Sequence, residues 1–293
     1  MIRTSSRLWS AALGVAACVA ACVGVASVAG AQDVDALRAK FHVNVPDISG
    51  VIAPGGFFRG APGTNSGSPL AFGPGWGDAF VGGGYQNAQR GIKNPVTHAF
   101  TPNGVEDGSI SGGFGLGDPK DAVGLEVVVT SLSTFRSGLG SRTAFSFKAH
   151  RMIDNTSAVA IGVENAFVAG SGKTDGTASV YAVASKVFLP PEEWAGLFKA
   201  LTLSGGVGNG RFRFLNDVIA DKSTVNVFGA ASLMFIDQLS AIADWTGQDL
   251  NVGVSIVPFK AFPVVFTPAI ADVTQTATSK ARFILGVGIG MHF

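Results

Sequence analysis

The residues of this chain best suited to catalysis or metal binding are four histidines and two cysteines: His42, His98, His150, His292, Cys18 and Cys22. A hydrolase would need a serine and a histidine within hydrogen-bond reach, with a third group orienting the base. No Gly-x-Ser-x-Gly motif occurs, and nothing marks one serine as a nucleophile. Nor do two histidines, or a histidine and a carboxylate, stand at metal-ligand spacing on one face of an element. We therefore expect no enzymatic activity, no cofactor and no metal.

A second group of residues could act on solutes through charge. These residues share one parity within alternating segments, and they are Glu126, Lys148, His150, Glu164, Lys186, Asp244, Arg282 and His292. Charged side chains that line a polar passage can select the solutes that pass. The alternative is a packed interior held together by ion pairs. Arg211 and Arg213 present a further choice, since they could bind an acidic sugar or a lipopolysaccharide phosphate or belong to a solvated loop.

The elements that position these residues are short alternating segments, which indicate β-strands. In residues 123–130, Val123, Leu125, Val127 and Val129 share one face, opposite Gly124, Glu126, Val128 and Thr130. By the same rule Tyr181, Val183 and Val187 form an apolar face opposite Ala182, Ala184 and Lys186. Twelve such segments are centred near residues 82, 112, 126, 146, 162, 183, 204, 229, 242, 253, 267 and 286. Short and long connections alternate between them.

The composition indicates what surrounds these strands. Hydrophobic residues make up 47% of the chain, charged residues only 14%, and there are 40 glycines. The second face of each strand is largely Gly, Ala and Ser, whereas a soluble β-sandwich would present Lys, Glu, Thr and Asp to water. Segments of about ten residues are long enough to cross a bilayer at a tilt. The predicted fold is an all-β, transmembrane, antiparallel up-and-down β-barrel of about 12 strands, spanning residues 77–293.

The first residues indicate export. Arg3 and Arg7 precede an apolar stretch that ends in Ala29-Gly30-Ala31, so residues 1–31 are predicted to be a signal peptide cleaved near Ala31. An uncleaved anchor is the alternative, and the residues before Cys18 and Cys22 also resemble a lipoprotein box. Residues 32–76 form a Gly/Pro-rich N-terminal extension, either periplasmic or folded back as a plug.

The closing stretch ARFILGVGIGMHF carries apolar residues at every second position back from Phe293, including Met291, Ile289 and Val287. It resembles the C-terminal signature of Gram-negative outer-membrane β-barrel proteins, which the barrel-assembly machinery reads. The resemblance implies a place in the outer membrane and contact with its lipid and lipopolysaccharide. The stretch ADWTGQDLNVGVSI, at 243–256, is also similar to a hairpin of barrels associated with exopolysaccharide export loci.

These observations together predict a narrow porin-like channel for small solutes. The alternatives are a structural or accessory barrel with a filled lumen, associated with the envelope or with polysaccharide export, and a surface enzyme. The formal net charge is only +1, so no nucleic-acid partner is expected.

Overall fold

The computed structural model describes residues 61–89, 92–93, 100–101, 105–170, 178–191, 196–259, 264–275 and 280–292. All of them belong to one compact unit, Arg38–Phe293. The predicted signal peptide 1–31, His42, His98 and the terminal Phe293 lie outside the described residues. The side chains of Met291 and His292 are likewise not described, although their backbone belongs to the last strand.

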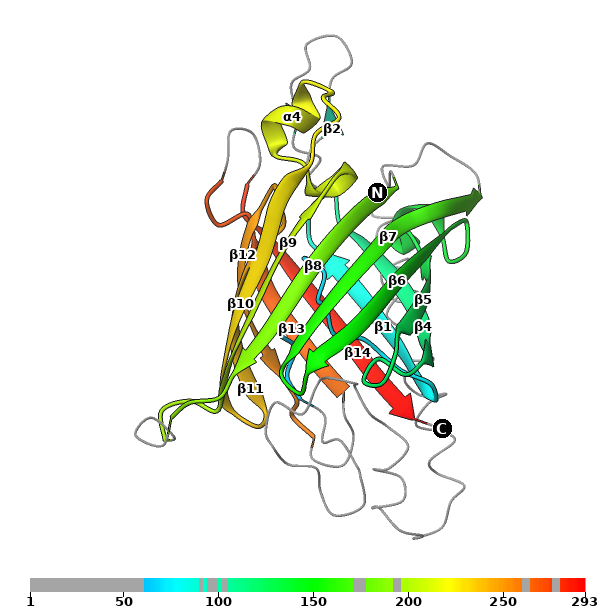
Figure 1. The fold of residues 1–293 in the computed structure, drawn as a ribbon. Coiled ribbons are helices and arrows are strands. Elements are labelled where there is room, and N and C mark those ends of the chain that lie inside the picture. Colours follow the sequence, from blue (N-terminus) through cyan, green and yellow to red (C-terminus); the bar gives the residue numbers. More distant parts are fainter. Residues whose placement is uncertain are drawn as a thin grey trace, which may run out of the picture. The chain divides into compact units, whose positions relative to one another are not determined.

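Twelve antiparallel strands form a closed barrel (Figure 1). They are β1 (Asp78–Gln86), β4 (Asp107–Gly117), β5 (Gly124–Ser131), β6 (Arg142–Asp154), β7 (Ser157–Gly170), β8 (Ser179–Phe188), β9 (Ala200–Gly208), β10 (Asn226–Ile236), β11 (Leu239–Trp245), β12 (Leu250–Ile256), β13 (Val264–Ala271) and β14 (Arg282–His292). Each pairs with its neighbours in chain order, and β14 closes on β1 in the register Asp78↔His292 to Gln86↔Ile284. The predicted fold class and all twelve predicted strands are confirmed.

Short elements lie between the strands. A two-stranded ladder pairs β2 (Ile92–Lys93) with β3 (Phe100–Thr101). Three helical turns, α3 (Thr134–Ser137), η2 (Gly210–Phe212) and α4 (Leu215–Ile219), follow β5 and β9. No helix of the described part is long and apolar enough to cross a bilayer.

The two faces of the wall differ in the way that the alternation predicts. On β7, Val159 and Ile161 point outward and are 43% and 65% exposed, whereas Ala158 and Ala160 point inward and are 1% and 5% exposed. Closure pairs the backbone groups of every strand, which is what a lipid surround requires. The barrel therefore presents large apolar side chains outward, while its inner face mixes small and polar side chains with an apolar cluster.

Strand β8 departs from the prediction. Its buried, inward side chains are Ser179, Tyr181, Val183, Ser185 and Val187, so the predicted lumen residue Lys186 lies on the outer face. The register explains the reversal, because Tyr181 is paired with the inward Gly162, and Lys186 with Ser157. Both faces of β8 are mostly Ala and Val, so alternation alone did not distinguish them. The prediction that Lys186 lines the lumen is wrong.

The two ends of the barrel differ in their connections. Tight turns join β4 to β5, β6 to β7 and β10 to β11 at the end where β14 terminates, and we call this the turn end. The opposite, loop end carries the longer connections, with η2 and α4 among them (Figure 1). Short periplasmic turns and longer extracellular loops are the usual arrangement in outer-membrane barrels.

Candidate functional site in the barrel lumen

Residues 61–75, which we call the inner segment, lie inside the barrel. They contact inward-facing side chains from strands around much of the wall. The Gly63 amide donates to Ser255 Oγ at 2.7 Å, and its carbonyl accepts from Ser240 Oγ at 2.7 Å. The Ala71 amide donates to Ser185 Oγ at 3.0 Å. Only a chain within the lumen can contact β8, β11 and β12 in this way.

The inner segment follows a U-shaped path. Gly63 lies near the turn end, beside Ser240 at the start of β11. Residues 66–68 reach Asp244, near the loop end of the same strand. The segment then returns, and the Trp76 amide donates to the Gly117 carbonyl at 2.8 Å, where β4 ends.

The tip of the U is held by one carboxylate. Asp244 Oδ2 accepts the backbone amides of Ser66, Gly67 and Ser68 at 2.7, 2.7 and 3.0 Å. Asp244 is fully buried. Successive amides that converge on an anion form a nest, and each such bond to a charged acceptor is stronger than a neutral one. The carboxylate of β11 therefore fastens the tip to the wall.

The returning arm is held by an ion pair. Lys148 Nζ lies 2.5 Å from Glu126 Oε2, and the two side chains are only 11% and 14% exposed. The same ammonium donates to the Phe72 carbonyl at 2.9 Å. His150 is 2% exposed beside this pair, and a Cβ on Gly73 would lie 2.9 Å from its ring. A side chain at position 73 would therefore require Glu126 or His150 to shift.

Arg211 of η2 connects the loop end to the tip. Its guanidinium forms a bidentate pair with Glu164, with Nη2 to Oε1 at 2.7 Å, and also donates to the Gly67 carbonyl at 2.9 Å. Burial by itself would lower the pKa of Arg211. The Glu164 carboxylate raises this pKa by more than burial lowers it, so the pKa lies above its ordinary value. Arg211 therefore joins η2 to Glu164 and to the inner segment, while its side chain stays 37% exposed, and its binding of an acidic ligand stays a prediction.

One half of the lumen is packed. Tyr181 and Phe228, from β8 and β10, contact Phe212 of η2 with ring centroids 5.7 and 4.5 Å from its ring. Phe72 of the inner segment and Met234 join the same buried cluster. Most inward residues of β7–β12 are buried. The sequence prediction placed Tyr181 toward lipid, whereas it lies at the centre of this core.

The other half is more open. Inward side chains of β14, β1, β4 and β5 remain partly exposed, and they are Phe80, Ser109, Ser111, Val128, Thr130 and Ile284. The inward glycines Gly82, Gly84, Gly286 and Gly288 lie among them. At the turn end the lining becomes buried, at Pro74, Gly75, Asp78 and Gly115. We call this partly exposed half the open side; its lining is buried at the turn end, and Asp107 and Arg282 are buried near its loop end.

The remaining predicted residues take different places. Arg282 is 8% exposed and donates to Asp249 Oδ2 at 2.5 Å, so it belongs to a buried pair. Val287 and Ile289 lie on the outer face of β14, across from Gly83 and Val81. Within the described residues, no group of three His, Cys, Asp or Glu side chains could hold a metal ion. The prediction missed the serine anchors Ser185, Ser240 and Ser255, whose only sequence signal is their parity.

Closure of twelve strands, an apolar outer face and a polar inner one decide the class of protein. The chain has the architecture of a Gram-negative outer-membrane β-barrel. No family model matches it, and no curated protein matches it. Solved structures with similar folds include an outer membrane channel from Pseudomonas putida F1, at 11% identity and TM-score 0.39, covering 73% of this chain and 95% of that one. Omp33, an outer membrane protein of Acinetobacter baumannii, has 11% identity and TM-score 0.36, over 74% of this chain and 98% of that one. The barrel assignment therefore rests on the strands of this chain itself.

Proposed function

We propose that this outer-membrane barrel is a narrow channel for small uncharged solutes, held closed at its turn end by the inner segment. The observation that carries the proposal is the contrast between the two halves of the lumen. The open side bears hydroxyls and glycines, such as Ser109, Ser111 and Thr130, that would suit a hydrated passage. Its blocked end is formed by residues 74–75, which a movement of the inner segment would clear.

The lumen charges favour an uncharged solute. Glu126 is paired with Lys148, Glu164 with Arg211, and Asp249 with Arg282. Asp244 is compensated by three amides of the inner segment. Paired charges exert a much weaker field on a passing ion than a ring of like charges would. Weak ion selectivity is therefore expected.

A second candidate is a structural barrel with a permanently filled lumen. The packed cluster around Tyr181 and the many bonds from wall to inner segment favour it. The two candidates differ in whether the inner segment leaves its place.

An engineered disulfide distinguishes them. A Cβ on Gly63 would lie 3.7 Å from Ser255 Cβ, within the range of about 3.5–4.5 Å for a disulfide. Gly63→Cys with Ser255→Cys would lock the inner segment to β12, in a background where Cys18 and Cys22 are serine. The matched control is Thr267→Cys with Gly286→Cys, which joins the wall strands β13 and β14. A Cβ on Gly286 would likewise lie 3.7 Å from Thr267 Cβ.

Single-channel recording in planar bilayers is the readout. The locked protein should be silent when oxidised and should conduct after reduction, whereas the control should conduct in both states. Equal conductance of the locked protein in both states would contradict gating by the inner segment. Silence of all folded variants would favour the filled barrel.

We also propose that β14 carries the signal read by the barrel-assembly machinery, through Val287, Ile289, Met291 and Phe293. The outward position of Val287 and Ile289 supports this, since an incoming strand presents that face to lipid and to the machinery. Replacing both by serine should lower the amount of heat-modifiable barrel in the outer membrane, while replacing the inward Gly286 and Gly288 by serine should not.

A further inference from the structure

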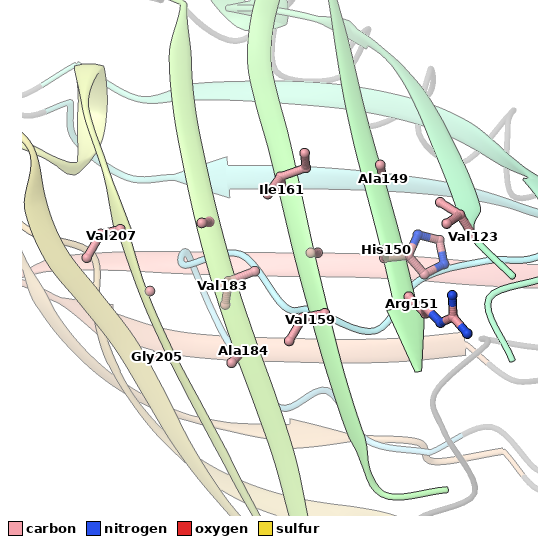
Figure 2. Close-up of a pocket in the computed structure, with 13 residues that line it drawn as sticks. Val123, Ala149, His150, Arg151, Val159, Ile161, Val183, Ala184, Gly205 and Val207 are labelled. Atoms are coloured by element: carbon pink, nitrogen blue, oxygen red, sulfur yellow. The ribbon is translucent and has the colours of Figure 1, made fainter. Parts of the chain in front are cut away.

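The outer wall carries a groove of about 540 Å³ across β6–β9 (Figure 2). It is lined by outward residues of four neighbouring strands, and they are Ala149, Arg151, Val159, Ile161, Ala182, Ala184, Gly205 and Val207. Unlike the lumen, this groove faces the membrane.

The groove lies where β8 and β9 present the small outward residues Ala182, Ala184 and Gly205, beside the larger Val159 and Ile161 of β7. Ala149, Ile161, Ala182 and Val207 form one row, and Arg151, Val159, Ala184 and Gly205 form the next. Neighbouring strands lie about 4.8 Å apart, so a row across four strands is roughly 14 Å long. No atom lies within 4 Å of the position that a Cβ on Gly205 would take. The result is a shallow apolar hollow over β8 and β9, bordered by Val159 and Ile161.

One end of the groove carries an arginine. Arg151 is exposed on the outer face and lines the groove near the turn between β6 and β7 (Figure 2). The nearby cation Lys186 is already paired with Asp154, at 3.2 Å. The neighbouring turn between β4 and β5, whose Pro119 carbonyl accepts from the Met152 amide, adds Asp118, Lys120 and Asp121, so the charges balance and Arg151 contributes an exposed guanidinium rather than an excess of positive charge.

An apolar hollow with an exposed guanidinium beside it complements an amphiphile with one anionic head. The guanidinium lies at the turn end of the barrel, which faces the periplasm in outer-membrane proteins, and the lipid there is phospholipid. We propose that this groove binds one anionic phospholipid, with an acyl chain along Ala184 and Gly205 and the phosphate at Arg151. Arginine suits the role because its guanidinium matches phosphate geometry with two parallel bonds. The site is independent of the lumen and of channel activity.

The test is lipid retention by the purified full chain, delipidated in a zwitterionic detergent and then titrated with phosphatidylglycerol or phosphatidylcholine. Native mass spectrometry counts the bound lipids. Wild-type protein should retain one phosphatidylglycerol and bind phosphatidylcholine more weakly. Arg151→Gln should weaken phosphatidylglycerol binding by about tenfold, since a charge-assisted bond is lost. Gly205→Phe should also weaken it, by filling the groove.

Two variants serve as controls. Lys199→Gln removes a cation that is paired with Asp237 at another turn of the same end, and Gly196→Phe adds a ring at a position with open space outside the groove. Both should retain lipid like wild type, and all variants should stay heat-modifiable. Equal retention by Arg151→Gln, Gly205→Phe and wild type would overturn the proposal. So would a dimer that both variants dissociate, because a second copy would then cover this face.

Discussion

Asp244 and Gly67 are 177 positions apart in the chain, and the Gly67 amide donates to the Asp244 carboxylate at 2.7 Å. Ser66 and Ser68 donate to the same oxygen. The carboxylate comes from the inner face of β11 near the loop end, and the amides come from a segment that precedes the first strand. This contact holds the tip of the inner segment inside the lumen.

Replacing Asp244 by alanine should release the tip. Three amides would lose a charged acceptor, and a bond to a charged group contributes about 1.5–3 kcal/mol. Hydrogen exchange at Ser66, Gly67 and Ser68 should become at least about tenfold faster, since 1.4 kcal/mol corresponds to tenfold. Amide exchange read by mass spectrometry of the folded protein checks this. Asp237→Ala, at an exposed turn, should leave these amides unchanged, and unchanged exchange in Asp244→Ala would show that the tip is held by other contacts.

Breaking the Glu126–Lys148 pair from one side should destabilise the barrel. Lys148→Met leaves a buried carboxylate without its cation, and such a loss typically costs about 3–5 kcal/mol. The double variant Lys148→Met with Glu126→Leu should recover much of that loss, because no buried charge remains. The temperature at which half of the folded gel band is lost measures the stability of each variant and ranks the variants. Lys186→Met, from the exposed pair with Asp154, should have little effect, and equal losses in both lysine variants would refute the buried pair.

Gly162 is required by Tyr181. A Cβ at position 162 would lie 2.4 Å from the Tyr181 hydroxyl, within the packed half of the lumen. Gly162→Ala should therefore cost about 1–3 kcal/mol, the usual range for overpacking. Gly205→Ala, on the outer face with open space around it, serves as the control. Urea unfolding followed by tryptophan fluorescence compares the two, and a stable Gly162→Ala barrel would mean that Tyr181 moves aside.

Filling the open side should reduce flux. A Cβ on Gly286 meets only Thr267, at 3.7 Å, so a larger side chain there is tolerated and projects into the lumen. Gly286→Phe should at least halve the swelling rate of proteoliposomes in a small neutral sugar. Gly205→Ala, on the outer face of β9 with open space around it, should swell like wild type. If Gly286→Phe leaves the rate unchanged, solutes do not pass along this side.

Alternation along the chain determined the twelve strands, their order and the lipid-facing surface of most of them. It did so because side chains of a strand point to opposite faces with a period of two, and because neighbouring strands in a closed barrel follow the chain. Glu126, Lys148, His150, Glu164 and Asp244 followed from the same rule. These properties are local, so the sequence by itself contains them.

Tertiary structure decided everything that depends on distant pairing. The orientation of β8 followed from the register Gly162↔Tyr181, since its two faces are nearly equal in hydropathy. The path of the inner segment followed from contacts such as Gly63 with Ser255 and Ala71 with Ser185, which join positions 192 and 114 apart. Serines and glycines give no sign of their partner until the barrel closes, because their hydrogen bonds and close approaches exist only once the two segments meet.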